Sequence, residues 1–350
     1  MRAALCLIAG LALAGCSESP GQAMAGEAGA GLITEAAQTI GQAAPEALAD
    51  AVDSLLAEIA PDAEAAPSPE PAAQACSGIL KQGGLIICDG APGDVFHLGS
   101  VTLTADETGS IQFGLARQAP LSLGVRARAL EAAFEIAERR DELRTVPGFD
   151  CDRIDARTPE QRAHAARSWE IKQAAFAAFH PGRGALDGFI RPSSAPPSSP
   201  FGPARRYIGV SKTSGEPCES MSVHQGYDMA APVGTPVVAP AAGVVTLADP
   251  DLYYEGGTIF LDHGHGLLSV FMHLSEVNVA PGDVVARGAV IAKTGNTGRS
   301  TGPHLHWGVK WRNPASENRG ADFYIDPALL LDLPVLDVAD AGGVLEMSAP

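Results

Sequence analysis

Histidines crowd into one stretch of this chain. Six of the nine lie between residues 224 and 306, and two of them, His304 and His306, are two positions apart. Residues two apart in a β-strand point to the same face, so a strand here would place both imidazoles on one side of a sheet. His224 and Asp228 add an imidazole and a carboxylate four residues apart around Gly226. Two imidazoles and one carboxylate suit a catalytic zinc site, in which three protein ligands leave a fourth position for water.

The composition favours a mainly β fold with many turns. The chain has 350 residues, including 39 Gly and 27 Pro, but only 5% are aromatic. This mixture is typical of short strands separated by turns, and the 46% of apolar residues suffices for a core. The length predicts roughly two folded units plus tails. The net charge of −17 excludes electrostatic capture of nucleic acid or of an anionic membrane, so we expect no nucleic-acid partner.

The N-terminus has the pattern of an export signal. Residues 1–15 carry one positive charge followed by an apolar run that is too short to span a membrane as a helix. The run ends in Leu13-Ala14-Gly15-Cys16, which resembles the bacterial lipobox, so Cys16 is the expected lipidation site and membrane anchor. Ser17, in place of Asp, favours the periplasmic face of the outer membrane. The alternative is an ordinary secretory signal with an incidental Cys.

Residues 16–75 are expected to form an acidic tether behind the lipidated Cys. From residue 17 to residue 75 the chain has ten acidic residues, no Lys or Arg, and abundant Ala, Gly and Pro, which cannot bury much surface. Apolar residues between Leu48 and Ile59 recur at helical spacing. This piece is interpreted as a transient helix or as an amphipathic helix that binds a partner.

Export determines how the four remaining cysteines are interpreted. An even number of cysteines in an oxidising compartment suggests two disulfides. We predict Cys76–Cys88, at the ends of a hairpin around residues 82–84, and Cys151–Cys218. The alternative is free thiols or a metal site, although the chain has no C-x-x-C pair.

The middle of the chain predicts a small β domain and a helical linker. Residues 76–130 contain short apolar runs between Gly, Pro and Asp turns, which are typical of a small β-sandwich-like domain. Residues 129–146 are compatible with a helix or an edge strand. Within the linker, 131–200, Thr158-Pro159-Glu160-Gln161 has capping-box spacing and predicts a helix over about 159–180. The Pro- and Ser-rich run 192–200 predicts a loop or domain joint.

Two features of the C-terminal region admit a second interpretation. Residues 234–245 and 282–291 share a turn-strand-turn-strand pattern that resembles carrier barrels, but Lys293 lies inside an apolar strand instead of at a hairpin tip. His263 and His265 flank Gly264 and could belong to a metal cluster, but we expect a hairpin turn there. His97, His164 and His180 are isolated and are interpreted as ordinary surface or core residues.

Four motifs then follow one another in order. They are His224-x-Gly226-x-Asp228, Ala230-Ala231-Pro232-x-Gly234-Thr235-Pro236-Val237-x-Ala239, Phe271-Met272-His273-Leu274, and Thr297-Gly298-x-Ser300-Thr301-Gly302-Pro303-His304-Leu305-His306. Together they resemble the lysostaphin-like zinc endopeptidases of peptidoglycan over residues 201–333, leaving 334–350 as a tail. The family often has Tyr where this chain has Phe271, and the loop before His224 carries an unusual Cys218.

The resemblance implies a fold, a cofactor and a division of roles. The fold would be a C-terminal β-barrel/sandwich-hybrid domain that binds one zinc ion through His224, Asp228 and His306. His273 and His304 would be the catalytic pair that does not bind the metal. Two imidazoles beside a zinc-bound water can accept its proton, stabilise the oxyanion and protonate the leaving amine.

The implied activity is hydrolysis of peptide cross-links in peptidoglycan, within the cell envelope. The expected substrate is the cross-linked stem peptide, cut after D-alanine, in preference to glycine bridges. A regulatory protein is considered as a further partner. The alternative is a non-catalytic scaffold that binds the wall or activates an amidase. A third hypothesis is self-inhibition, in which residues 131–200 or the 202–222 loop cover the groove.

Overall fold

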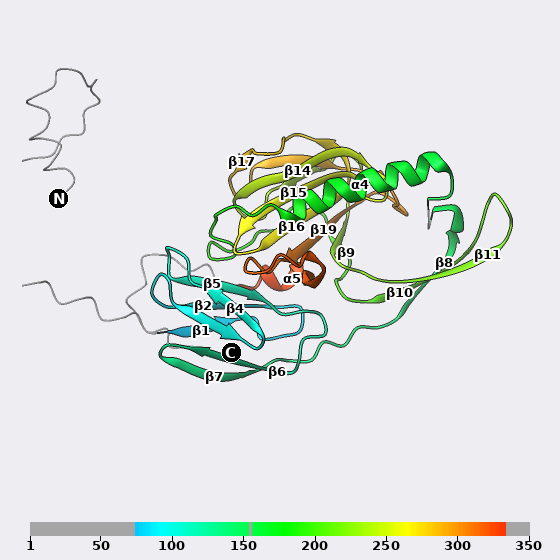
Figure 1. The fold of residues 1–350 in the computed structure, drawn as a ribbon. Helices are drawn as coiled ribbons and strands as arrows, with labels where there is room; N and C mark the ends of the chain where they lie inside the picture. Colours follow the sequence, from blue (N-terminus) through cyan, green and yellow to red (C-terminus); the bar gives the residue numbers. More distant parts are fainter. Residues whose placement is uncertain (1–73, 154–155, 334–350) are drawn as a thin grey trace, which may run out of the picture. The chain divides into compact units, whose positions relative to one another are not determined.

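The computed structural model describes residues 74–153 and 156–333 (Figure 1). They lie within one compact unit, Pro71–Pro350. The expected signal peptide, Cys16, the tether, its helical piece and the 334–350 tail lie outside the described residues. Among the described helices, none combines the length and the hydropathy that crossing a bilayer requires.

Two small antiparallel sheets begin the described chain. One has the order β1-β2-β5 and the other β4-β3-β6-β7. Their bounds are β1 Ala75–Gly78, β2 Leu85–Asp89, β3 Val95–Leu98, β4 Val101–Thr104, β5 Ser110–Gly114, β6 Ser122–Ala127 and β7 Leu130–Glu135. Leu85, Ile86, Phe96 and Val125 are fully buried in their core. The stretch 129–146, which the sequence left open as helix or strand, forms β7 at its start, where half-buried and exposed side chains alternate, and its last residues begin a further strand, Arg144–Asp150.

The expected hairpin and both predicted disulfides are present. β1 pairs antiparallel with β2, with Cys76 directly opposite Cys88, and the two are bonded. Cys151 is bonded to Cys218, 67 residues further along the chain. The free-thiol and metal alternatives for these four residues are wrong.

Helix α4, Pro159–Ala177, starts where the sequence predicts. Its capping box is complete, because Thr158 accepts from the Gln161 backbone while the Gln161 side chain accepts from the Thr158 backbone. The helix ends three residues before the predicted limit. Only part of the expected apolar face is buried: Phe176 stacks on Phe260, whereas Trp169 is 60% exposed.

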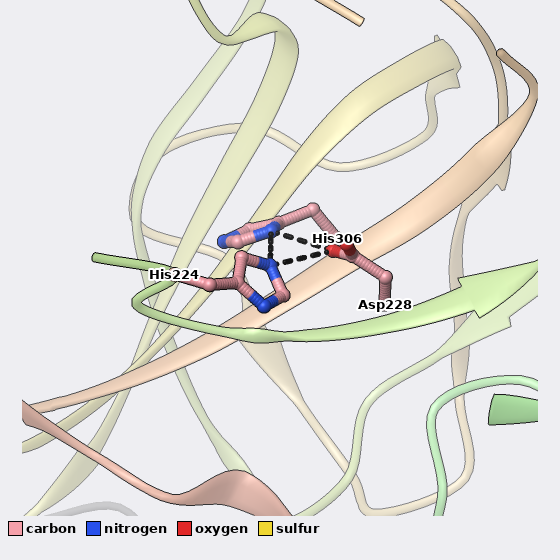
Figure 2. Close-up of side chains that lie close together, drawn as sticks. All are labelled: His224, Asp228 and His306. Atoms are coloured by element: carbon pink, nitrogen blue, oxygen red, sulfur yellow. Dashed lines mark hydrogen bonds and ion pairs between the residues drawn. The ribbon is translucent and has the colours of Figure 1, made fainter. Parts of the chain in front are cut away.

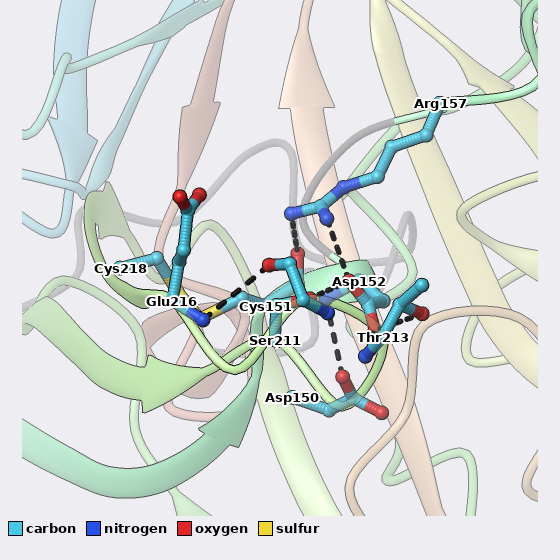
Figure 3. Close-up of a disulfide and its surroundings, with 9 residues drawn as sticks. Asp150, Cys151, Asp152, Arg157, Ser211, Thr213, Glu216 and Cys218 are labelled. Carbon is cyan, nitrogen blue, oxygen red and sulfur yellow. Dashed lines mark hydrogen bonds and ion pairs between the residues drawn. A yellow bond between two sulfur atoms is a disulfide. The ribbon is translucent and has the colours of Figure 1, made fainter.

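A second three-stranded sheet is assembled from distant segments. Its order is β11-β10-β8, with bounds β8 Arg144–Asp150, β10 Ala204–Val210 and β11 Pro217–Val223. β8 runs parallel to β10, and β10 and β11 form a long hairpin that is seen side-on in Figure 1. At the far end of β8, the short 3-10 helix η1, Cys151–Arg153, carries the disulfide to β11 (Figure 3). Asp152 there accepts hydrogen bonds from Ser211 and Thr213 in the β10–β11 turn.

The C-terminal region is a ten-stranded sheet. Its main path is β17-β14-β15-β16-β19-β12-β9, with β13, β18 and β20 paired alongside. The bounds are β9 Pro197–Ser199, β12 Tyr227–Ala230, β13 Pro236–Val238, β14 Gly243–Leu252, β15 Gly256–Gly264, β16 Leu267–Val277, β17 Val284–Val285, β18 Val290–Thr294, β19 His304–Trp311 and β20 Phe323–Ile325. The 3-10 helix η2, Arg319–Ala321, lies between β19 and β20, and helix α5, Pro327–Leu330, follows β20. Every residue of β15 is buried, as expected for a central strand. The mainly β fold with a large C-terminal sheet is therefore confirmed, and the run predicted as a loop before residue 200 contains β9.

Polar contacts join the N-terminal sheets and the linker to this large sheet. Arg139 bonds the Asp326 carboxylate at 2.6 Å and also reaches the Phe201 carbonyl oxygen. Arg312, fully buried, pairs with Asp262 at 2.9 Å and donates to the carbonyl oxygen of Phe176 at the end of α4. Buried charges are tolerated when they are paired in this way.

Candidate metal centre

Three side chains converge at one end of the large sheet (Figure 2). His306 Nδ1 lies 2.9 Å from Asp228 Oδ1 and 3.2 Å from His224 Nε2, and His224 Nε2 lies 3.0 Å from Asp228 Oδ1. One nitrogen or oxygen of each residue lies within 4.8 Å of the others. His224 and Asp228 are 5% and 6% exposed, so these donors are held largely out of water.

Strand pairing explains this convergence. β12 pairs antiparallel with β19 so that Asp228 is opposite His306 and Ala230 is opposite His304. Period-two alternation then turns His304 and His306 to the same face, as the sequence predicts. Gly226, between His224 and Asp228, has no room for a side chain, because a Cβ there would lie 2.4 Å from the His306 ring.

Neighbouring groups orient the donors. His224 Nδ1 donates to the Pro200 carbonyl oxygen at 2.7 Å, which leaves Nε2 as the ligand atom. Arg205 Nη2 donates to Asp228 Oδ2 at 3.0 Å, which leaves Oδ1 to face the two imidazoles. Arg205 also bonds Ser199 Oγ at 2.7 Å, so its guanidinium is fixed at two points.

The electrostatics favour metal-binding protonation states. Burial alone would raise the pKa of Asp228, but its hydrogen bonds to His224 and His306 outweigh burial and hold the pKa far below the ordinary range. Burial lowers the pKa of His306, although the Asp228 carboxylate opposes this effect. An ionised carboxylate and a neutral imidazole are the forms that bind a divalent metal.

A second pair of imidazoles lies beside the triad. The rings of His273 and His304 are 4.8 Å apart, and His304 Nε2 lies 3.8 Å from Asp228 Oδ1. His273 Nδ1 donates to the Thr297 carbonyl oxygen at 2.9 Å, and His304 Nδ1 donates to the Gly302 carbonyl oxygen at 2.8 Å. In a neutral ring with this hydrogen bond, Nε2 is the nitrogen that carries no proton. Burial is the main cause of a lowered pKa at His273, and the neighbouring His306 and His304 add to it. Together they lower the pKa to about 3, so this ring is neutral near pH 7.

His273 also has an unusual backbone. Its φ of 64° lies in the left-handed region, which non-glycine residues adopt rarely and at a cost. The pairing of β16 with β18 shifts register just beyond this residue, between Leu274 and Glu276. The His273 N–H leaves the ladder and donates to the Glu255 carbonyl oxygen at 2.8 Å. Backbone strain of this kind is concentrated at functional sites.

These groups line a cavity of about 660 Å³. One wall comes from the large sheet and its 299–303 loop, and the other from the face of the β8-β10-β11 sheet. The segments that the sequence suggested as a cover, 131–200 and 202–222, thus contribute lining residues, among them Arg144, Ser199 and Tyr207.

The donor set fits a single divalent metal ion. Two imidazole nitrogens and one carboxylate oxygen are donors that zinc accepts, and three protein ligands leave an open coordination position. Among the residues that the structure describes, this is the one group of three or more metal-binding side chains that meets at a point. The metal itself and the role of each residue stay predictions.

Other histidines are placed where their hydrogen bonds explain them. His263 donates to the Ala242 carbonyl oxygen at 2.8 Å and accepts from Ser269. His265 lies in the β15–β16 turn, and its Nε2 is 3.1 Å from Asp106 Oδ2. His164 bonds the Asp251 carbonyl oxygen and His180 contacts Asp262. The expected hairpin turn at residues 264–266 is present, and Lys293 lies within β18, paired with Glu276.

Sequence reasoning missed the residues that support the site from other segments. Arg205 and Arg144 precede the motifs, and Glu255 lies in a turn between two of them. The alternation of Arg205 with Tyr207 was a weak signal that both belong to one strand face. No signal along the chain indicates that residue 144 pairs with residue 205, because parallel pairing across sixty residues is a tertiary property.

Comparisons with known proteins agree with this geometry. Residues 222–318 match the family described as Peptidase family M23. The chain is 43% identical over 84 residues to the peptidoglycan DD-endopeptidase ShyA of Vibrio cholerae, covering 24% of this chain and 19% of that protein. It thus spans about a fifth of the length of the curated relatives it matches.

Solved structures are similar over longer stretches. A crystal structure of an M23 peptidase from Pseudomonas aeruginosa is 29% identical and covers 72% of this chain and 95% of its own, with a TM-score of 0.49. The catalytic domain of lysostaphin from Staphylococcus simulans is 31% identical, with 40% of this chain and 93% of that one covered and a TM-score of 0.31.

Proposed function

We propose that this chain, whose residues 222–318 match peptidase family M23, is a zinc-dependent endopeptidase that hydrolyses peptide cross-links of peptidoglycan. The observation that carries this proposal is the His224, Asp228 and His306 triad set beside two further imidazoles in one cavity. The name of the Vibrio cholerae relative, a peptidoglycan DD-endopeptidase, supports the choice of substrate and of a bond that follows D-alanine.

His224, Asp228 and His306 would hold one zinc ion. The ion would lower the pKa of a water and polarise the scissile carbonyl. Arg205 keeps Asp228 in one orientation through Oδ2, and the Pro200 carbonyl oxygen keeps His224 in one tautomer. Both restraints place donor atoms in advance, which reduces the reorganisation that the reaction requires.

His273 and His304 would carry the proton transfers. The Nδ1 atom of each ring is occupied by a backbone carbonyl oxygen, so Nε2 is the atom available to substrate and water. A neutral His273 can accept a proton from the attacking water at pH 7. In its neutral form His304 could share this role, and in its protonated form it could stabilise the oxyanion or protonate the leaving amine.

The remaining proposals concern location. We propose that Cys16 is acylated and that the protein is anchored at the periplasmic face of the outer membrane, with the acidic segment to residue 75 as its tether. The lipobox-like Leu13-Ala14-Gly15-Cys16 supports the anchor. The two disulfides support an oxidising compartment.

The test uses a soluble form that begins at residue 17. It is incubated with purified peptidoglycan, and the conversion of cross-linked dimers to monomers is followed by mass spectrometry. We expect dimers to disappear with the intact protein and to persist after zinc is removed by a chelator or after His304→Ala.

A matched control is His164→Ala, which removes an imidazole outside the cavity and should leave cleavage unchanged. Unchanged digestion by His304→Ala would contradict the proposed catalytic pair. Zinc binding and wall binding without any release of new amines would instead favour the scaffold that activates another enzyme.

A further inference from the structure

The β8-β10-β11 sheet presents one face to the cavity. Its register pairs Arg144 with Arg205 and Arg205 with Ser222 in one row, and Val146 with Tyr207 and Tyr207 with Ser220 in the next. Because alternate residues share a face, these rows lie on the same side of the sheet. All of them line the cavity: Arg144, Val146, Arg205, Tyr207, Ser220 and Ser222.

The first row holds two arginines side by side. Because β8 and β10 are paired at these residues, the two positively charged side chains start from neighbouring backbone positions on one face. The chain as a whole has a net charge of −17, so this row is a local positive patch on an acidic protein. An anionic group that enters the cavity is attracted to the positive charge of this row.

The two arginines differ in what they already bind. Arg205 is engaged by Asp228 and Ser199 and serves the metal centre. Arg144 is exposed, and within residues 74–153 and 156–333 no carboxylate forms an ion pair with it. Arg144 is therefore the guanidinium in this row that is available to a ligand.

Strand spacing places Arg144 within reach of a short peptide that also passes Arg205. Neighbouring strands are about 4.8 Å apart, so Arg144 lies one strand spacing beyond the arginine that touches Asp228. One or two residues of extended peptide span such a separation at about 3.3 Å each. Val146 and Phe149, further along β8, add an apolar surface beside it.

We propose that Arg144 forms a subsite for a free carboxylate of the substrate, close to the scissile bond. A guanidinium can donate two parallel N–H bonds to a carboxylate, a geometry that a neutral amide cannot match. The proposal rests on the endopeptidase function and specifies its substrate class. That class is cross-linked stem peptides whose diamino acid at the cross-link keeps its carboxylate unamidated. Bridges made of glycine present no such group within the bridge.

The test compares two cross-linked peptide dimers that differ in one group, a free carboxylate or its amide, on the diamino acid at the scissile bond. Wild-type protein should cleave the acid about ten- to a hundredfold more efficiently in kcat/KM, mainly through KM. Arg144→Met should lose this preference by slowing cleavage of the acid only.

The matched control is Arg206→Met. Arg206 is the next residue to Arg205 on β10, points to the opposite face and pairs with Glu219 at the surface. It should keep the wild-type preference. Thermal unfolding and zinc content of both variants verify that the fold and the metal centre are intact.

A binding measurement separates this proposal from the proposed function. In the His304→Ala background, calorimetry should show tighter binding of the acid than of the amide, and Arg144→Met should abolish the difference. Equal binding of the two dimers, or a preference that survives Arg144→Met, would overturn the carboxylate subsite. If the wild-type protein cleaved neither dimer while the acid still bound more tightly than the amide, the proposed peptidase activity would be wrong and the carboxylate subsite would stand.

Discussion

At the scale of single residues, the metal centre depends on groups that bind no metal. Asp228 offers one oxygen to the imidazoles, and its other oxygen is held by Arg205 at 3.0 Å. A carboxylate fixed at one oxygen cannot rotate away from its partners. All three candidate ligands were predicted from the sequence, whereas the guanidinium that orients Asp228 comes from a strand before the motifs and was not predicted.

We therefore predict that Arg205→Met weakens zinc binding about ten- to a hundredfold, because it releases Asp228 Oδ2. Competition with a chromophoric chelator measures the change in Kd. Arg206→Met, on the other face of the same strand, should bind zinc as the wild type does. A wild-type Kd for Arg205→Met would mean that the strand pairing of β12 and β19 suffices to hold Asp228.

His263 makes stability depend on pH. Burial lowers its pKa to about 4, whereas an unfolded chain titrates histidine at about 6.5. Between these values the unfolded chain binds more protons than the folded one. The contribution of His263 to stability is therefore complete above about pH 6.5 and decreases as the pH falls toward 4, by up to about 3 kcal/mol.

The measurement is urea unfolding of metal-free protein at several pH values between 5 and 8. His263→Gln should be less stable at pH 7, since it disturbs bonds to Ala242 and Ser269, but its stability should change less with pH. His97→Gln, at an exposed position, is the control and should follow the wild-type curve. Parallel curves for wild type and His263→Gln would exclude this residue as a source of the pH dependence.

At the scale of elements, helix α4 supports the catalytic side of the cavity from outside. Ser168 accepts from the Tyr253 backbone at 3.0 Å, and Lys172 pairs with Glu255. The Glu255 carbonyl oxygen in turn accepts from the His273 N–H. The helix thus holds the turn that fixes the left-handed backbone of His273.

We predict that Lys172→Met destabilises the protein by about 3 kcal/mol, because it leaves the Glu255 carboxylate buried without its partner. The double variant Lys172→Met with Glu255→Gln removes that charge and should recover most of the loss. Thermal or urea unfolding of the two variants measures this. Equal losses in both would show that the packing of the lysine stem, not the ion pair, carries the effect.

Local rules predicted some elements and not others. The capping box at Thr158 and the two histidines on one face of β19 depend only on residues close together in the chain, so the sequence sufficed to predict both. β8 was missed because its partner, β10, lies sixty residues away and no local pattern encodes a parallel pairing. The exposed Trp169 shows the same limit, since burial on a helix depends on what packs against it.

At the scale of the whole molecule, residues 201–333 do not carry all of their own stabilising contacts. Asp326 relies on Arg139, the Trp311 indole donates to the Gln112 carbonyl oxygen at 3.0 Å, and β12 pairs with β9. The boundary expected at residue 201 therefore separates partners that the fold brings together.

We predict that a 201–350 fragment is much less stable than residues 74–350. It loses β8 and β9, leaves Asp326 and Arg312 without several partners, and leaves Cys218 without Cys151. Circular dichroism during thermal unfolding and resistance to trypsin would compare the two. A fragment that unfolds at the same temperature as the longer form would show that the N-terminal contacts contribute little.

The two walls of the cavity have one further consequence. The family match starts at residue 222, so it includes the metal centre and both catalytic candidates but excludes β8 and β10. If Arg144 selects the substrate as proposed, a residue that chooses the substrate lies before the stretch that carries the candidate metal ligands. A comparison restricted to the matched region does not include that residue. Natural variation at residue 144 would then change which cross-links are cleaved, whereas Arg205 on the neighbouring strand is tied to Asp228.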